Sequence, residues 1–442
     1  MSQGTGYLLP SQPVASVAEH SAMGGGEALR WALRVGPEAV AAEIRAAGLR
    51  GRGGAGFPTG IKWQGLQRES APVKYFACNA AEGEPGTFKD RALMRANPYQ
   101  LVEGVAIAAF AVDAAEAYIG VKVRFEQELS ALERAIAEMA AADLLGPTPI
   151  TISTGPDDYL FGEEKGLLEV IDGRDPLPTL YPPYIRGLFA DEESSNPTVV
   201  NNVETLSHVP HILRNGAEWF RSHGTEDSPG TMVFTISGDV RRETVTELPM
   251  GTPLAVLLYG FGEGLAAGRR PKAVISGVAN APLPPSLIET PMDFGSMQAV
   301  GTGLGSGGFM VYDDTACMVR VAAVLSKFNW VESCGQCPPC KLGTEALTAR
   351  FEAIDAGRAT AQDLEEAVAW TSQVTDANRC GLGQGERNLA TGMLEAFWDE
   401  FAAHLDGGCP SDRRIRLPKL IDYDPEAGRF TYDEGYLERR LP

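Results

Sequence analysis

The sequence predicts an α/β protein with a largely parallel sheet, followed by a small α+β segment and a helical bundle. Strand-like and helix-like stretches alternate between residues 74 and 153, which is typical of an α/β layer. Short β-rich runs flank a helical stretch between residues 230 and 292. From residue 314 to residue 405 the pattern is helical, with cysteines at the expected loops.

The alternating region follows an amphipathic helix that Pro37 opens and Gly48 closes. Proline suits the first helical turn, and glycine suits the position beyond the last one. A glycine-rich loop comes next. The apolar pattern then predicts strands over residues 74–78, 118–123 and 149–153, and helices over residues 98–112 and 126–141.

The rest of the chain completes five predicted parts. In the middle segment, strands are expected over 231–237 and 272–276 and a helix near 253–259; later helices are expected over 315–328, 340–356, 361–372 and 386–405. Residues 174–200, rich in Pro and Gly, are expected to form an ordered loop. The predicted domains are a loose leader at 1–28, an α/β domain at 29–228, an α+β domain at 229–310, a helical domain at 311–405 and a surface tail at 406–442.

Composition excludes several classes of function. The chain has 442 residues and a formal net charge of −20, so it repels nucleic acid, and no basic patch with interleaved aromatics offsets this. No apolar run is long enough to cross a bilayer. The N-terminus lacks a basic segment followed by an apolar stretch, so we expect a cytoplasmic protein. An anionic ligand must then be met by backbone N–H groups and a few cations.

Three of the seven cysteines are packed into seven residues, which indicates a metal centre. Cys334, Cys337 and Cys340 form C-x2-C-x2-C, and Cys380 follows 40 residues later. Three close thiolates plus a remote fourth fit an iron–sulfur cubane better than structural zinc, which usually uses two separated pairs. A zinc knot and free thiols stay open as alternatives. The isolated Cys78, Cys317 and Cys409 are expected to be small buried hydrophobic residues.

A glycine loop near the N-terminus is the second candidate site. Gly51, Gly53 and Gly56 match G-x-G-x-x-G, but the loop follows a helix, whereas the dinucleotide fingerprint follows a strand. The loop allows a backbone to approach a phosphate closely, with Arg52 and Lys62 among the neighbouring cations. A flexible surface loop is the alternative.

Polar residues near the predicted strand ends form a third group of candidates. Carboxylates on these loops could accept hydrogen bonds from ribose hydroxyls, although paired acids on loops are most often solvated surface charge. Asn201 and Asn202 offer amide groups of both polarities, or a helix cap. The acidic candidates are Glu82, Glu84, Glu163 and Glu164.

Taken together, these motifs resemble the NADH-binding flavoprotein subunit of respiratory complex I, and the diaphorase subunits of NAD-linked hydrogenases and formate dehydrogenases. Residues 48–60, with Lys62 and Trp63, are similar to the family's flavin loop. The resemblance runs from about residue 29 to residue 405. The other matching stretches, in the family order, are 84–91, 162–164, 200–205, 303–308 and 332–340.

The resemblance implies NADH oxidation (or NAD reduction) on FMN, with one-electron transfer to a [4Fe–4S] cluster on Cys334, Cys337, Cys340 and Cys380. It also implies a β-grasp-like middle domain, a thioredoxin-like [2Fe–2S] partner subunit and a larger Fe–S partner subunit. Glu84 is expected to position the nicotinamide. The implied cofactor-binding residues are Gly51, Arg52, Gly53, Gly54, Gly56, Phe57, Lys62, Asn79, Glu82, Glu84, Tyr159, Gly162, Glu163, Glu164, Asn201 and Asn202.

Some positions depart from the family pattern on the nucleotide side. An acid that helps to hold FMN is Ala81 here, an expected aromatic is Gly65, and an expected lysine is Tyr181. One alternative is therefore an electron-relay subunit of the same fold that has lost NADH binding. Another is a structural metal-binding subunit that only assembles partners.

Overall fold

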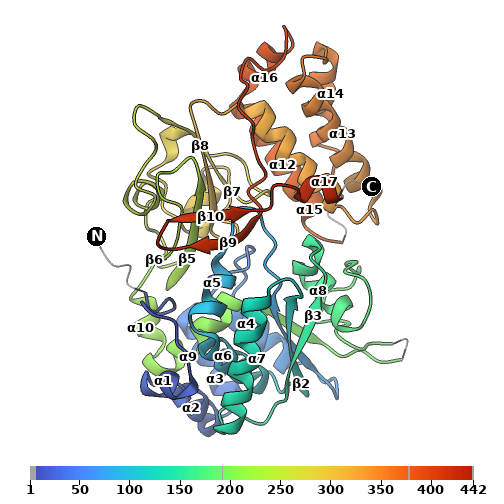
Figure 1. The fold of residues 1–442 in the computed structure, drawn as a ribbon. Coiled ribbons are helices and arrows are strands. Elements are labelled where there is room, and N and C mark those ends of the chain that lie inside the picture. Colours follow the sequence, from blue (N-terminus) through green and yellow to red (C-terminus); the bar gives the residue numbers. More distant parts are fainter. Residues whose placement is uncertain (1–5, 192, 377–378, 441–442) are drawn as a thin grey trace. The chain divides into compact units, whose positions relative to one another are not determined.

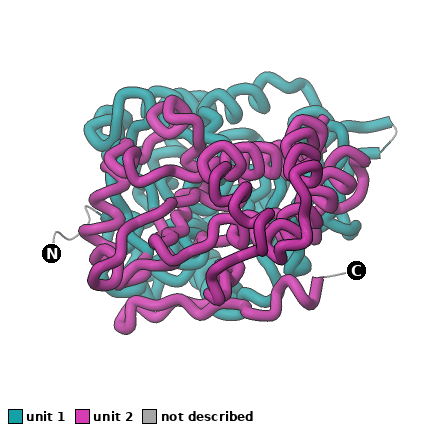
Figure 2. The backbone as a smooth tube through the Cα atoms, turned by 90° about the horizontal axis from the view of Figure 1, so that it is seen from above, with its two compact units in different colours: residues 1–83, 88–233, 245–251 teal, residues 84–87, 234–244, 252–442 magenta. Residues whose placement is uncertain are grey.

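A computed structural model describes residues 6–191, 193–376 and 379–440. The chain divides into two compact units, which Figure 2 colours separately. Unit 1 comprises residues 1–83, 88–233 and 245–251, and unit 2 comprises residues 84–87, 234–244 and 252–442. Neither unit is one continuous segment, so the short stretch 84–87 belongs to unit 2 although unit 1 surrounds it in sequence.

Unit 1 contains a four-stranded sheet in the order β3-β2-β1-β4, and every neighbouring pair is parallel. The predicted α/β layer with a parallel sheet is thus confirmed. The strand order reverses beside β1, because β2 lies on one side of it and β4 on the other. In open α/β sheets, ligands bind outside the carboxyl ends of the strands at such a reversal. The strands are β1 (Tyr75–Ala80), β2 (Glu116–Lys122), β3 (Ile150–Gly155) and β4 (Thr198–Asn202).

Helices cover this sheet (Figure 1). α6 is buried along almost its whole length, and it packs against α7 and α9 in the core of unit 1. The three helices that the sequence predicted here are confirmed as α3, α6 and α7, whereas the other helices, including the 13-residue α9, and the strand β4 were not predicted. The helical elements are α1 (Val17–Ala22), α2 (Glu27–Val35), α3 (Pro37–Ala47), α4 (Thr59–Gln67), α5 (Lys89–Ala96), α6 (Pro98–Ala111), α7 (Glu126–Ala141), η1 (Tyr159–Gly162), α8 (Glu164–Ile171), α9 (Val203–Asn215) and α10 (Ala217–Arg221).

The leader expected to be loose is packed from residue 6 onward, which corrects that expectation. Leu8 is fully buried; its N–H donates to Glu247 Oε2 at 2.9 Å, and its carbonyl accepts from Gln100 at 2.8 Å. Val14 is also buried, and α1 lies within the segment. A Ser- and Gly-rich composition hid a few anchoring residues whose partners lie far away in sequence.

A second four-stranded sheet has the order β6-β5-β8-β7. β8 runs parallel to β5 and antiparallel to β7. The strands predicted at 231–237 and 272–276 are confirmed as β5 and β7, and the helical stretch near 253–259 appears as a single turn of π-helix, η2. The elements are β5 (Thr231–Gly238), β6 (Thr244–Pro249), η2 (Val256–Phe261), β7 (Pro271–Ser276), η3 (Pro285–Leu287), α11 (Phe294–Ala299) and β8 (Gly308–Asp313).

In the described part of unit 2 a series of helices follows, and the first two pack along each other across a five-residue turn at 333–337. The tail adds a hairpin and a short helix, which the sequence did not predict. Among the described residues, no helix is both long and apolar enough to span a bilayer. The elements are α12 (Met318–Glu332), α13 (Pro338–Asp355), α14 (Ala361–Thr371), α15 (Leu382–Ala396), α16 (Trp398–His404), β9 (Leu420–Asp424), β10 (Arg429–Tyr432) and α17 (Tyr436–Arg440).

Candidate flavin, nucleotide and iron–sulfur sites

Three asparagines meet at the carboxyl ends of β1 and β4. Asn79 is the register partner of Asn202, and its Nδ2 donates to the carbonyl of Gly162 at 2.7 Å. Asn202 caps α9, because its Oδ1 accepts from the Glu204 N–H at 3.0 Å. The neighbouring Asn201 accepts from Trp63 Nε1 at 2.8 Å. The helix-cap interpretation of the Asn pair is confirmed for Asn202, and its role in binding a cofactor stays a prediction.

The glycine loop in unit 1 is a backbone cradle. Gly51 N–H bonds back to the Phe57 carbonyl at 2.9 Å, which closes the loop. Within the described part of the chain, no hydrogen-bond acceptor meets the backbone N–H groups of residues 53–56. A Cβ added at Gly53 would lie 3.2 Å from Asn202 Cβ, and Gly54 and Gly56 have φ of +124° and +63°, where side chains are strained. Consecutive unbonded N–H groups on such a loop fit a phosphate-bearing ligand.

Arg52 holds this loop from inside. Its side chain is fully buried, and it donates to the carbonyls of Pro229 at 2.8 Å and Thr231 at 3.2 Å. Its backbone N–H donates to Thr205 Oγ1 at 2.8 Å. Burial lowers the pKa of Arg52, and the carboxylate of Glu204 opposes that shift. The guanidinium therefore fixes the shape of the cradle with its hydrogen bonds directed at protein carbonyls.

The side chain of Lys62 forms hydrogen bonds to both β4 and the start of α8. Its Nζ donates to the Val200 carbonyl and to Glu164 Oε2, both at 2.9 Å. Glu164 is the first residue of α8, so its carboxylate also lies in the helix's favourable first turn. Phe57, in the segment that closes the cradle, is 55% exposed. Tyr159 and Gly162 are the two ends of η1.

Two predicted cofactor residues, Glu82 and Glu163, have their carboxylates engaged in the fold. Glu82 accepts from the Asp90 N–H at 2.9 Å and from Arg91 Nε at 3.2 Å. Glu163 caps α8 by accepting from Lys165 N at 2.8 Å and Gly166 N at 3.0 Å. Burial raises the pKa of Glu163 to about 7. Both residues thus shape the loops that surround the strand ends.

A buried charge cluster beneath Asn202 was missed by the sequence analysis. Lys89 Nζ lies 2.7 Å from Asp90 Oδ1, 3.0 Å from Glu204 Oε2 and 3.1 Å from Asn202 Oδ1. Burial alone would lower the pKa of Lys89, but the Asp90 and Glu204 carboxylates raise it overall. With Arg52, Arg91 and Glu82, three cations face three carboxylates. The signal was present as charged residues at the starts of two helices, but surface charge has the same appearance in a sequence.

Glu84 belongs to unit 2 and is positioned by that unit's backbone. Its Oε1 accepts from the Val278 N–H at 2.7 Å. A Cβ added at Gly277 would lie 2.3 Å from Glu84 Oε1, so only glycine allows this approach. The carboxylate is therefore held in one orientation by the loop after β7.

The four cysteines predicted as cluster ligands lie at helix starts in unit 2. Cys334 and Cys337 are in the turn between α12 and α13, Cys340 is in the first turn of α13, and Cys380 precedes α15. All four are partly exposed. Burial raises the pKa of Cys340, with smaller raising contributions from Cys334, Cys337 and Glu386 of α15. Since α13 also packs on α15, the two segments approach each other, and four soft thiol ligands fit an iron–sulfur cluster.

The expectation for the three isolated cysteines needs one correction. Cys78 is fully buried in β1 within the core of unit 1, as expected. Cys317 and Cys409 are not isolated: they lie in one group with Asp355 and His404. Their separation of 92 positions in the sequence concealed this, because only the packing of four elements brings them together.

Comparison with known proteins agrees with this division of the chain. Residues 44–211 match the family model described as the Nuo51 FMN-binding domain, and residues 320–404 match the NADH-ubiquinone oxidoreductase-F iron-sulfur binding region. The NADH-quinone oxidoreductase F-subunit 2 of Rhizobium meliloti is 40% identical over 88% of this chain and 94% of its own length. The NADH-quinone oxidoreductase F-subunit of Mycobacterium bovis is 37% identical over 91% of this chain and 93% of its own length.

A solved structure shares the fold. The crystal structure of an NAD+-reducing [NiFe]-hydrogenase in the air-oxidised state superposes with a TM-score of 0.76 at 35% identity, over 86% of this chain and 64% of the hydrogenase chain. A flavin-binding domain joined to an iron–sulfur region defines a class of electron-transfer subunits. Within that class, this chain belongs to the family of NADH-quinone oxidoreductase F-subunits.

Proposed function

We propose that this chain oxidises NADH on FMN and passes the electrons one at a time to a [4Fe–4S] cluster, as one subunit of a larger assembly. The flavin part of the proposal rests on Asn79, Asn202 and the glycine cradle. They lie together at the point where the strand order of the parallel sheet reverses. The cluster part rests on four partly exposed cysteines in or beside α13 and α15, two helices that pack on each other. Bound FMN supplies acceptance of a hydride and release of single electrons.

The protein's own contribution is orientation and electrostatics. The unbonded N–H groups of residues 53–56 receive the flavin phosphate, with Gly51, Gly53, Gly54 and Gly56 leaving it room. Arg52 keeps that loop in shape, and Glu82 and Glu163 fix the neighbouring loops. Asn79, Tyr159, Gly162, Asn201 and Asn202 would hold the rest of the FMN.

The nucleotide is received by a smaller set of residues. The exposed Phe57 offers a ring face, and the Lys62–Glu164 pair offers a cation for phosphate and an acceptor for hydroxyls. Glu84, held by Val278, positions the nicotinamide without acid or base chemistry. None of these side chains is assigned a role as a nucleophile, because hydride transfer is chemistry that the bound cofactors would supply.

We also propose a domain organisation and partner subunits. The domains proposed are an FMN/NADH domain at 29–228, a β-grasp-like domain at 229–310 and a helical [4Fe–4S] domain at 311–405. A thioredoxin-like [2Fe–2S] subunit and a larger Fe–S subunit would take the electrons onward at the cytoplasmic side of the assembly. The partly exposed cysteines support such a handover, because a cluster near the surface is within reach of an external acceptor.

Anaerobic titration with NADH tests the proposal. Holo-protein at fixed concentration receives NADH while the flavin absorbance is followed, and bleaching by one equivalent is expected. A flavin-loaded protein that dithionite bleaches and NADH does not would instead be the electron relay. Ala81, Gly65 and the exposed Tyr181 favour testing that alternative. NADH-dependent reduction of ferricyanide gives a second readout. A colourless protein that contains zinc and no iron would instead support the structural subunit that only assembles partners.

A further inference from the structure

Four potential metal ligands meet at the end of the helical region away from the predicted iron–sulfur ligands. Cys317 Sγ, His404 Nε2, Cys409 Sγ and a carboxylate oxygen of Asp355 all lie within 4.8 Å of one another. Cys317 Sγ and His404 Nε2 are 3.2 Å apart. In a tetrahedral zinc site, bond lengths of about 2.0 and 2.3 Å place neighbouring ligand atoms roughly 3.5 Å apart. The group therefore has the size of a single-ion site.

The ring of His404 is oriented to bind a metal through Nε2. Its Nδ1 lies 2.7 Å from the Glu400 carbonyl, which can only accept, so the proton is on Nδ1 and the Nε2 lone pair faces Cys317. Such a second hydrogen bond is the usual way in which proteins orient a metal-binding imidazole. The ring is 2% exposed, so water does not compete for the lone pair.

Backbone N–H groups point at both sulfur atoms. Arg320 N–H donates to Cys317 Sγ at the start of α12, and Ser411 N–H donates to Cys409 Sγ, each at 3.4 Å. Cys409 is fixed in turn by its own N–H, which donates to the Asp355 carbonyl at 3.1 Å. N–H donors directed at sulfur help to hold a metal-bound thiolate, the form that each cysteine takes once the metal has displaced its proton.

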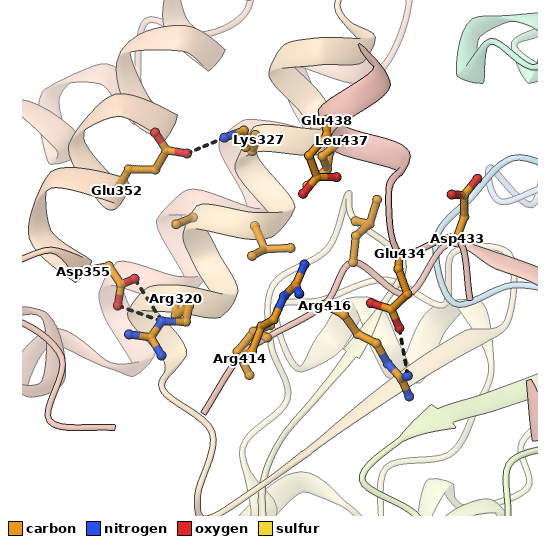
Figure 3. Close-up of a pocket in the computed structure, with 14 residues that line it drawn as sticks. Arg320, Lys327, Glu352, Asp355, Arg414, Arg416, Asp433, Glu434, Leu437 and Glu438 are labelled. Carbon is orange, nitrogen blue, oxygen red and sulfur yellow. Dashed lines mark hydrogen bonds and ion pairs between the residues drawn. The ribbon is translucent and has the colours of Figure 1, made fainter. Parts of the chain in front are cut away.

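The charges around the group balance for a divalent ion. Arg320 Nε lies 3.0 and 3.2 Å from the two Asp355 oxygens, and Figure 3 shows its side chain turned from α12 toward Asp355 at the end of α13. Two thiolates neutralise a divalent cation, and Arg320 neutralises the carboxylate. Two sulfurs, one imidazole nitrogen and one carboxylate oxygen form a donor set that suits zinc.

We infer that Cys317, His404, Cys409 and Asp355 form a structural zinc site, separate from the [4Fe–4S] cluster. The site ties the start of α12, the ends of α13 and α16, and the segment that leads into the tail. α12 begins at this group and ends beside Cys334, so its 15 residues separate the two centres by roughly 22 Å. Each centre can then be removed without the other.

Metal analysis of the full-length, anaerobically purified protein tests the inference. About one zinc per chain is expected in addition to the cluster iron. Cys317→Ser and Cys409→Ser should each lower zinc at least tenfold and leave iron and flavin unchanged. Cys78→Ala, which removes a buried thiol from unit 1, is the matched control and should keep its zinc. X-ray absorption at the zinc edge of the unmodified protein should show two sulfur and two lighter ligands.

Three results would overturn the inference. The first concerns metal content: either only trace zinc in protein produced with added zinc, or iron in excess of the cluster iron instead of zinc. The second is zinc retained in both serine variants. The third is a Cys317–Cys409 disulfide found by mass spectrometry under anaerobic conditions. Loss of NADH oxidation with zinc intact would instead count only against the proposed function, because the two readouts are independent.

Discussion

Asn79 and Asn202 are register partners at the adjoining ends of β1 and β4, where the order of the parallel sheet reverses. Two motifs 123 positions apart in the sequence thereby become one site. Asn202 is committed to the α9 cap and to Asp90, 2.7 Å from its Nδ2. Asn79 links β1 to η1 through the Gly162 carbonyl and accepts from the Ala81 N–H. Asn79 is therefore the member of this pair whose substitution leaves the α9 cap intact.

Asn79→Ala should weaken flavin binding about five- to tenfold, because the hydrogen bond to the Gly162 carbonyl contributes about 1 kcal/mol and that carbonyl loses its partner. Flavin per chain, measured after gel filtration, should fall while iron per chain stays constant. Asn215→Ala on α9 is the control, since its side chain bonds only to the His211 carbonyl of its own helix. Full flavin retention in Asn79→Ala would remove this residue from the proposed site.

Lys62→Gln should raise the KM for NADH roughly three- to tenfold with little change in kcat. The lost contact binds the nucleotide equally in the ground state and in the transition state, so its removal raises KM and leaves kcat almost unchanged. The size of the effect follows because a charge-assisted hydrogen bond contributes about 1 kcal/mol to binding. Steady-state ferricyanide reduction measures both constants. Lys327→Gln breaks a comparable ion pair with Glu352 at 2.8 Å in unit 2, so it should leave both constants unchanged. A fall in kcat at constant KM would contradict a role in nucleotide binding.

Arg52→Lys should destabilise unit 1 by roughly 3 kcal/mol. A lysine cannot reproduce the forked set of donors, and breaking a buried charge network typically costs this much. The urea midpoint of unit 1, followed by near-ultraviolet circular dichroism, measures the effect. Arg30→Lys on the exposed face of α2 is the control. An unchanged midpoint together with lost flavin would show that Arg52 contacts the cofactor instead of the loop.

Cys380→Ser should lower iron per chain by more than half and abolish the electron paramagnetic resonance signal of the dithionite-reduced protein. One thiolate ligand is removed, and the three thiolates of the 334–340 segment hold a cubane poorly. Flavin content should persist, since its proposed ligands belong to unit 1. Cys78→Ala should keep both the iron and the signal. A normal signal in Cys380→Ser would require another fourth ligand.

The sequence identified elements whose signals are local. The parallel layer, the α3 helix between Pro37 and Gly48, and the C-x2-C-x2-C segment all follow from periodicity, caps or spacing. Features defined by distant partners escaped: the packed leader around Leu8, the Lys89 charge cluster, and the group of Cys317 with Cys409. In each case the residue type was visible, but burial was not, because burial depends on which segments meet in the fold.

The stability of unit 2 should depend on pH through Glu386. This carboxyl is fully buried on α15 and accepts from Ser326 Oγ at 2.5 Å and Asn329 Nδ2 at 2.7 Å. Burial raises its pKa from 4.5 to about 7. Between those values the folded state therefore binds more protons than the unfolded state. The free energy of unfolding must then fall as pH rises through this window.

Glu386→Gln removes this dependence because an amide stays neutral. We expect the difference in free energy of unfolding between variant and parent, measured in guanidinium at pH 5 and pH 8, to shift by up to ~3 kcal/mol in favour of the variant at pH 8. Taking the difference between variant and parent cancels the pH dependence that comes from every group the two proteins share. Glu395→Gln, at an exposed site on the same helix, should give no shift. A shift in the opposite direction would mean that the folded protein holds Glu386 ionised within this pH window, against the raised pKa.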